Sequence, residues 1–392
     1  MSDELPQGWA MPLLGEVVRI KQGNSKLTKK FYKPDGKYVA FSGSGPDGRV
    51  DEYEHEGKAI VLSAVGARCG KCFKADGQWT AIANTAVIRP HLADDAHYEY
   101  LFYLLNNEDF WPKGGTAQPF VQTGLAQRET TIPLPPLAEQ RRIVAKLETL
   151  LGRLDACQQR LAKIPVLLKR FRQSVLAAAC SGRLTADWRE GNQIEDEWPT
   201  EPLSELFAMR NGKSLTVAKR KDGNIPVFGG NGLMGNHNAA NAEGQVIVIG
   251  RVGAQCGNVH FISGKVWVTD NAISLEAKRK VEPAFYTYFL RSQNLNQLSA
   301  GTGQPYVSQE ILGPIETPVV SLAEQQEIVR RVEALFALAD QIAARFTKAQ
   351  VQVDKLTPSL LAKAFRGELV PQNPADEPAE KLLERIQIKA AQ

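Results

Sequence analysis

The chain has 392 residues, enough for two or three domains that each bury a core. Hydrophobic residues make up 43% and charged residues 23%, as in ordinary globular proteins, and no run of about 20 apolar residues predicts a membrane span. The net charge is only +4 and the five cysteines are scattered, so we expect no disulfide scaffold, no signal peptide and a reduced, cytoplasmic protein.

Residues 1–136 predict a first globular domain, rich in glycine, proline and short β-branched runs. Ala59–Leu62 predicts a buried strand and Tyr98–Leu105 a short helix. This mixture is typical of an α/β domain in which strands dominate.

Residues 137–182 predict a long central spacer helix with an apolar residue every 3.5 positions, the pattern of a coiled-coil seam. Over residues 137–185, Lys and Arg outnumber Asp and Glu by ten to three, whereas the flanking segments are nearly balanced. These cations are interpreted as a solvated face, as phosphate contacts or as part of a partner interface. The seam includes Ile143, Leu147, Leu150, Leu154, Leu161 and Leu168.

Residues 183–321 predict a second globular domain, with strands over Val246–Ile249 and Lys265–Thr269 and a helix over Pro283–Leu290. A distal spacer helix follows over residues 322–366, and residues 367–392 are interpreted as a tail. We expect Pro165 and Pro358 to kink or break the two long helices. The second seam includes Ile328, Val332, Leu335, Ile342, Phe346 and Val353.

The two halves of the chain repeat one another, because five short motifs recur in the same order at an offset that drifts only from 189 to 185 residues. The matched pairs are Pro6–Trp9 with Glu197–Pro199, Val65–Gly70 with Val252–Gly257, Ala83–Ala86 with Thr269–Ala272, Gly115–Val121 with Gly301–Val307, and Leu137–Gln140 with Leu322–Gln325.

Two equivalent seams in one chain predict that the helices pair with each other. Because the ends of a compact domain tend to lie close together, the second domain requires the helices to run antiparallel. The predicted fold is therefore two tandem α/β domains separated by an antiparallel coiled coil, with approximate two-fold symmetry. Each seam is about 48 Å long at ~1.5 Å per residue. Since DNA repeats every ~34–36 Å, such a coiled coil suits two domains that read a split DNA site.

The full chain resembles the specificity subunits of type I restriction-modification systems. The resemblance rests on Pro133–Val144 and its repeat Pro318–Val329, on Ser181–Leu184, and on Ala364–Leu369. It implies two target-recognition domains that each read one half of an asymmetric double-stranded DNA site, with helices that also hold two modification subunits. It further implies that the modification subunits bind S-adenosylmethionine and that motor-nuclease restriction subunits use ATP and Mg²⁺. This chain itself is then expected to bind no cofactor or metal and to have no catalytic residue.

Base reading requires forked donors and acceptors, Arg or Lys for guanine and Asn or Gln for adenine, and phosphates attract further cations. Two domains that read different sequences should differ where they touch bases, so the dissimilar segments 24–50 and 213–240 are favoured over the matched glycine–proline loops. The DNA-binding candidates are Lys21, Asn24, Lys26, Lys29, Lys30, Arg68, Lys71 and Gln118 in the first domain, and Asn211, Lys213, Lys219, Arg220, Lys221, Arg251, Gln255 and Gln304 in the second.

Three patterns suggest other chemistry. Phe41–Gly45 matches a methyltransferase F-x-G-x-G loop, but an adenosyl loop should open a helix and the residues that follow do not predict one. Pro46–Asp47 with Glu56–Lys58 fits a loose nuclease pattern, whose lysine is missing from the second copy. Cys69 and Cys72 lack the second pair that zinc requires, so small buried thiols are favoured. A free-standing methyltransferase or nuclease, and a scaffold that binds only proteins, stay as alternative hypotheses.

Overall fold

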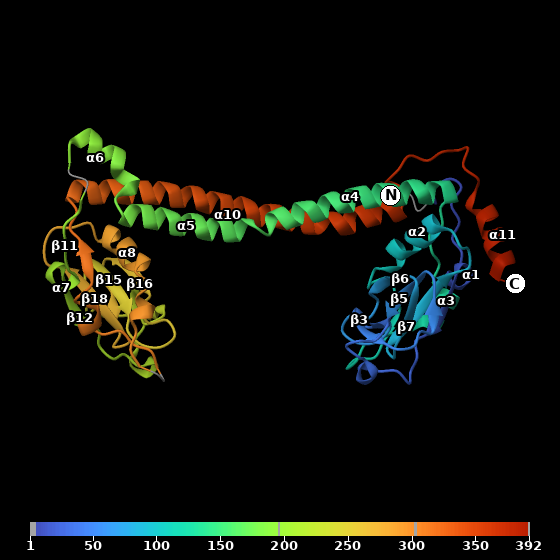
Figure 1. The fold of residues 1–392 in the computed structure, drawn as a ribbon, viewed down its shortest axis with the longest axis horizontal. Coiled ribbons are helices and arrows are strands. Elements are labelled where there is room, and N and C mark those ends of the chain that lie inside the picture. The colour runs from blue at the N-terminus through green and yellow to red at the C-terminus, as the bar shows by residue number, and fades with distance from the viewer. Residues whose placement is uncertain (1–4, 195–196, 302–303, 391–392) are drawn as a thin grey trace. The chain divides into compact units, whose positions relative to one another are not determined.

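The computed structural model describes residues 5–194, 197–301 and 304–390. Contacts between residues divide the chain into two compact units: residues 1–160 with 349–392, and residues 161–348. Figure 1 draws both units, with each globular domain beside long helices. No helix in the described ranges is long and apolar enough to cross a membrane.

The first unit contains two four-stranded sheets. One is fully antiparallel and carries the strands in the order β1-β8-β5-β6; the other has the order β3-β2-β7-β4 and joins β2 to β7 in parallel. The strands are β1 (Val18–Gln22), β2 (Tyr38–Ser42), β3 (Gly45–Val50), β4 (His55–Glu56), β5 (Ala59–Ser63), β6 (Cys72–Ala75), β7 (Gln78–Ala81) and β8 (Thr85–Pro90), with a small pair β9 (Lys113–Gly114) and β10 (Phe120–Val121).

Helices cover the antiparallel sheet β1-β8-β5-β6 and complete the core of the first unit. Ile60 and Leu62 of β5 share that core with Leu101 and Leu105, because alternate residues of a strand point to the same face. The helical elements are α1 (Leu14–Val17), η1 (Lys29–Phe31), α2 (Asp95–Leu105), α3 (Thr123–Glu129), α4 (Leu137–Leu161), the end of α10 (Leu322–Phe365) and α11 (Ala379–Ala390).

The second unit repeats the strand order of the first. Its larger antiparallel sheet has the order β12-β18-β15-β16, and its smaller sheet, β14-β13-β17, again joins two strands in parallel. The strands are β11 (Thr200–Pro202), β12 (Phe207–Asn211), β13 (Ile225–Gly229), β14 (Gly232–His237), β15 (Gln245–Gly250), β16 (Val259–Ser263), β17 (Trp267–Val268), β18 (Ala272–Ala277) and β19 (Glu316–Pro318). The predicted fold class of two tandem α/β domains with long helices is confirmed.

The helices of the second unit resemble those of the first. Those predicted at Tyr98 and Pro283 are both present as α2 and α8, which occupy equivalent places in the two units. The helical elements are α5 (Ile164–Cys180), η2 (Arg183–Thr185), α6 (Ala186–Asn192), α7 (Leu203–Leu206), η3 (Val217–Lys219), α8 (Pro283–Ser292), η4 (Leu295–Leu298), α9 (Gln309–Leu312) and the start of α10.

The long helices are antiparallel within each unit. In the first unit, the start of α4 shares a core with the end of α10, which contributes Leu361 and Ala364. In the second unit, the end of α5 shares a core with the start of α10, where Ile328 and Val332 lie. Of the seam residues, those fully buried are Ile143, Leu147, Leu168, Ile328, Val332 and Val353. Those half-buried are Leu150, Leu154, Leu161, Leu335 and Phe346, whereas Ile342 is 41% exposed.

The two prolines act differently. The first long helix is interrupted, since α4 ends at Leu161 and α5 begins at Ile164 with Pro165 in its first turn, where the missing N–H costs nothing. Pro358 lies inside α10, which continues without a break to Phe365. The expected break at this second proline is therefore absent from α10.

Residues 367–392 are more than a tail, which corrects the sequence interpretation. They contain α11, whose Leu382 and Ile386 are buried in the core of the first unit. Asp376, just before it, forms an ion pair with Arg142 of α4 at 2.6 Å.

The repeated Leu-Ala-Glu-Gln motif fixes the start of each long helix to its domain. In the first copy, Trp9 Nε1 donates to buried Glu139 at 3.0 Å, and Gln140 Nε2 donates to the carbonyl of Pro135. In the second, Trp198 Nε1 donates to buried Glu324 at 3.3 Å, and Gln325 Nε2 donates to a backbone carbonyl that precedes the helix. In each copy, the tryptophan motif and the Leu-Ala-Glu-Gln motif therefore form one contact between the domain and its long helix.

Candidate nucleic-acid interface

Two of the repeated motifs meet at one turn in each domain. In the first domain, Val65–Gly70 connects β5 to β6, and the Gly66 amide donates to the carbonyl of Pro119 at 2.9 Å. In the second, the Gly253 amide donates to Pro305 at 2.9 Å. Both glycines have positive φ, 104° and 88°, which other residues rarely adopt. The matched glycine–proline loops therefore support this turn through their backbones.

The two turns present one side chain that differs. Arg68 and Gln255 occupy the same position, and both are exposed, whereas the cysteine that follows each is buried, as predicted. Burial also raises the pKa of the nearby Cys72 thiol, which donates to the carbonyl of Leu105. The cysteines are thus packing groups beneath the turn.

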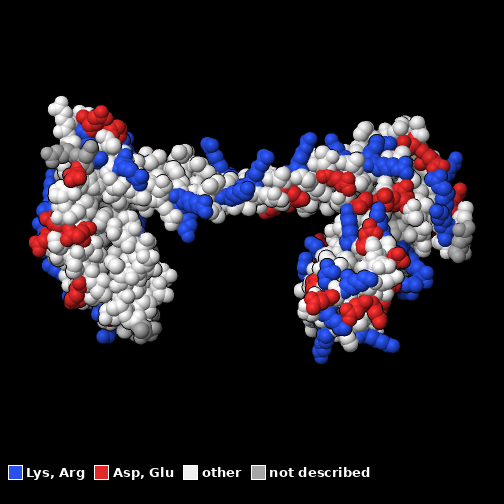
Figure 2. All heavy atoms as spheres, viewed as in Figure 1, with Lys and Arg blue, Asp and Glu red and all other residues white. Residues whose placement is uncertain are grey.

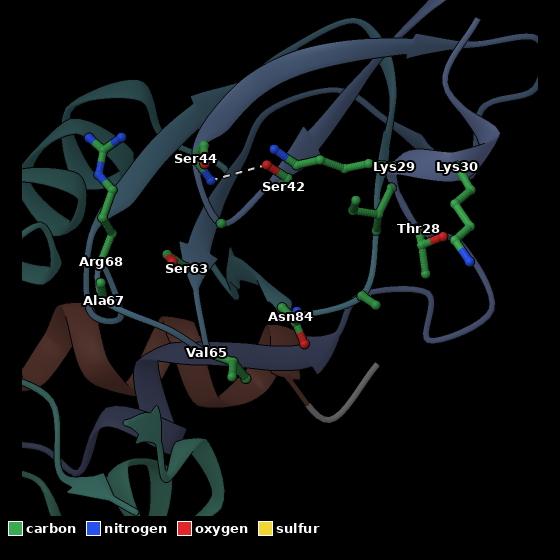
Figure 3. A pocket seen from close by; sticks show the side chains of 13 residues that line it. Thr28, Lys29, Lys30, Ser42, Ser44, Ser63, Val65, Ala67, Arg68 and Asn84 are labelled. Atoms are coloured by element: carbon green, nitrogen blue, oxygen red, sulfur yellow. Dashed lines mark hydrogen bonds between the residues drawn. The ribbon is translucent and has the colours of Figure 1, made fainter. Parts of the chain in front are cut away.

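A hollow of about 670 Å³ lies beside the turn in the first domain. Figure 3 shows Arg68 on one side of it and Lys29 and Lys30 on the other, with Ser63 and Asn84 between them. The first-domain hollow is lined by Thr28, Lys29, Lys30, Ser42, Gly43, Ser44, Ser63, Val65, Ala67, Arg68, Ile82, Ala83 and Asn84. Lys29 and Lys30 of η1 and Arg68 of the turn, which are separated in the sequence, therefore converge on one hollow.

The second domain has a hollow of about 400 Å³ at the equivalent place. Its Asn231, Val252 and Asn271 correspond to Ser44, Val65 and Asn84 of the first hollow. The second-domain hollow is lined by Gly230, Asn231, Leu233, Met234, Val252, Asn271 and Gln304, with no Lys or Arg. On the face that Figure 2 draws, the sheet region of this domain is largely uncharged, whereas that of the first domain carries many charged side chains.

The remaining candidates in the first domain differ in availability. Lys29 pairs with Asp47 at 2.5 Å. Burial opposes ionisation of Asp47, but hydrogen bonds from Lys29, Ser42 and Tyr32 outweigh it and lower the pKa of this carboxyl. Asn24 is held by Glu54 and by the amide of Lys26, so it shapes a turn.

Four other candidates lie outside the first hollow. Lys21 lines a separate cavity with Arg19 and Arg89. Lys26 and Gln118 are exposed and Lys71 is half-buried, and none of these three lines the hollow.

In the second domain, several candidates hold the backbone. Arg220 donates to the carbonyl of Met234 at 2.6 Å, and Arg251 donates to that of Asp270 at 3.3 Å. Gln304 lines the hollow, although Thr302 and Gly303 of its loop lie outside the described residues. The other candidates, Asn211, Lys213, Lys219 and Lys221, are exposed and lie outside its lining.

Sequence reasoning missed several residues of the two hollows. Asn84 and Asn271 belong to a repeated motif, so that repetition was a usable signal. Leu233 and Met234 are 62% and 44% exposed, which their apolar character did not predict. The glycines of Phe41–Gly45 lie where β2 turns into β3, so this motif forms a β-hairpin.

Comparison with known proteins identifies the family. The type I restriction modification DNA specificity domain matches residues 6–166 and again residues 195–351, so it covers both repeats. The chain belongs to the type I restriction-modification DNA specificity family. The specificity subunit of the type I restriction enzyme EcoDI from Escherichia coli is 29% identical over 99% of this chain and 96% of its own length.

Other members of the specificity family are also similar to this chain in sequence or fold. The StySPI specificity subunit from Salmonella potsdam is 35% identical over 66% of this chain and 64% of its own length. The crystal structure of the HsdS subunit from Thermoanaerobacter tengcongensis shares the fold, with a TM-score of 0.62, 22% identity, and coverage of 93% of this chain and 98% of that one. DNA sequence recognition, as the specificity subunit of a type I system, is therefore the function of this chain.

Proposed function

We propose that each domain reads one half of a split double-stranded DNA site through its hollow and the adjacent turn. The observation that carries this proposal is the pair of equivalent hollows, which share a backbone frame, a valine and an asparagine but differ in their other side chains. A common frame keeps the mode of DNA contact the same, and different side chains allow different base sequences.

The long helices set the distance between the half-sites in this proposal. α10 is one helix of 44 residues that contributes to both units. At ~1.5 Å per residue it is about 66 Å long, well over one ~34–36 Å turn of DNA. Base pairs between the half-sites are then spanned without being read.

The helices also carry a surface suited to partner subunits. Leu167 and Leu338 are 58% and 50% exposed and, with the exposed seam residue Ile342, line an apolar hollow of about 300 Å³. Exposed apolar clusters of this kind mark protein interaction sites. We assign this surface to one of two modification subunits. Motor-nuclease restriction subunits join the resulting complex.

This chain acts without catalysis in the proposed complex. S-adenosylmethionine, ATP and Mg²⁺ belong to the partner subunits, which supply methyl transfer, movement and cleavage. The β-hairpin at Phe41–Gly45 supports this division of roles, because an adenosyl-binding loop should lead from a strand into a helix.

Selection of binding sites from random duplex DNA tests the proposed function. The complex of this chain with its modification subunit is incubated with the library, and bound DNA is sequenced. Two short blocks at a fixed separation are expected. A single uninterrupted block would contradict division of the site between the domains, and binding without any sequence preference would contradict base reading by either domain.

A further inference from the structure

We propose that Arg68 and Gln255 are a matched pair of specificity-determining residues, with Arg68 contacting guanine in one half-site and Gln255 contacting adenine in the other. This inference rests on the proposed function and assigns its base readout to one position of the repeat.

The backbones that carry the two side chains are the same. The amide two residues after each side chain, of Gly70 or Gly257, donates to the strand before the turn at 2.9 and 2.8 Å. The amide three residues after each side chain donates back to the carbonyl of Arg68 at 3.1 Å or of Gln255 at 3.2 Å. Each turn is also tied to its proline loop. A side chain exchanged between these positions therefore starts from the same backbone.

Arg68 is available for a ligand. Its guanidinium has no hydrogen bond or ion pair within the part of the chain that the structure describes, although it borders the first-domain hollow. Other candidates are engaged: Lys29 with Asp47, and Arg220 with the carbonyl of Met234. A free guanidinium on a rigid turn can offer two parallel donors, which match O6 and N7 of guanine in the major groove.

Gln255 is held in one orientation. Asn258 Nδ2 donates to its Oε1 at 2.7 Å, which leaves the two Nε2 donors and the second lone pair of Oε1 without a partner among the described residues. An amide in this state can donate to N7 of adenine and accept from N6. Lys71 takes the place of Asn258 in the first domain, so this amide support is specific to the second turn.

The surroundings of each side chain agree with its assigned base. Lys30, which has no ion pair within the described residues, adds a cation across the first hollow from Arg68, which suits the acceptors of guanine. Exposed Leu233 and Met234 line part of the second hollow beside its amide side chains, and they suit the methyl group of thymine opposite adenine. The two half-sites should therefore differ in composition, with guanine beside the first domain and A·T pairs beside the second.

Reciprocal exchange tests the assignment. Arg68→Gln and Gln255→Arg are each assembled with the modification subunit and carried through binding-site selection, with Arg330→Gln on exposed α10 as the matched control. We expect Arg68→Gln to reduce the preference for guanine at one position of one half-site by about 10- to 100-fold and to leave the other half-site unchanged. Gln255→Arg should change one position in the other half-site only, from adenine toward guanine.

Three results would overturn the inference. A split site that is unchanged by both exchanges refutes this pair while the proposed function stands. An equal loss of affinity for all sequences identifies phosphate contacts instead of base readout. A wild-type complex that selects no split site refutes the proposed function and this inference together. Unaltered thermal unfolding of the variants shows that the turn has kept its fold.

Discussion

A buried ion pair holds the second domain to its long helix, and removing its cation should loosen that joint. Arg189 Nη1 lies 2.6 Å from Glu324 Oε1, and the two side chains are only 5% and 2% exposed. Thr185 and Trp198 also donate to Glu324. Arg189→Met keeps most of the side-chain volume but leaves a buried carboxylate without its cation, which costs about 3–5 kcal/mol.

Hydrogen–deuterium exchange with peptide mass spectrometry measures this effect within one unit. Because ~1.4 kcal/mol is tenfold, we expect exchange of peptides from α6 and the start of α10 to accelerate about 100-fold or more, as far as the local opening energy allows. The matched control is Arg330→Met, which breaks an exposed pair with Glu327 that solvent screening makes weak. Equal exchange in the two variants would refute the account of this joint.

Four further predictions follow from the core, the helix surface, a buried histidine and the helix length. Ile328→Ala removes a fully buried side chain and should lower the free energy of unfolding in urea by about 2–5 kcal/mol; a loss below about 1 kcal/mol would contradict its packing. Ile342→Ser should leave that free energy nearly unchanged but weaken binding of the modification subunit in calorimetry, and unchanged affinity would contradict the docking surface. Burial lowers the pKa of His97 below its usual 6.5, so its contribution to stability is full above about pH 6.5 and is lost as pH falls toward the folded-state pKa. The difference in unfolding free energy between wild type and His97→Gln should therefore change across this pH window. A constant difference would contradict the burial of a neutral imidazole. One heptad inserted beside Leu154 and another beside Val353 should lengthen the unread DNA between the half-sites by about 3 base pairs, because seven residues add about 10.5 Å and each base pair about 3.4 Å. Selected DNA with an unchanged spacing between its half-sites would contradict the role of the helices.

The sequence predicts those features whose cause is local or periodic. The apolar run at Val246–Ile249 predicts β15, since a buried strand needs apolar side chains on both faces. The repeat at a spacing of 3.5 residues predicts the long helices, and Pro165 predicts the interruption between α4 and α5. α11 was missed, although Leu382 and Ile386 have the i, i+4 spacing of a buried helix face.

The candidate site depends on contacts that sequence spacing does not reveal. Lys29 and Lys30 meet Arg68 at one hollow only because η1 and the β5–β6 turn come together in the fold. Asn24 looked like a base-reading amide, but its partners Glu54 and the Lys26 amide make it a turn residue. A side chain's partners decide whether it is available, and those partners are far away in the sequence.

Single-molecule sequencing of adenine methylation tests the central claim most directly, in cells that express this chain with its modification subunit. A methylated motif of two short specific blocks, separated by a fixed number of unspecified bases, is the predicted result. A continuous motif, or no new motif although the complex assembles and binds S-adenosylmethionine, would contradict recognition of a split site by two domains.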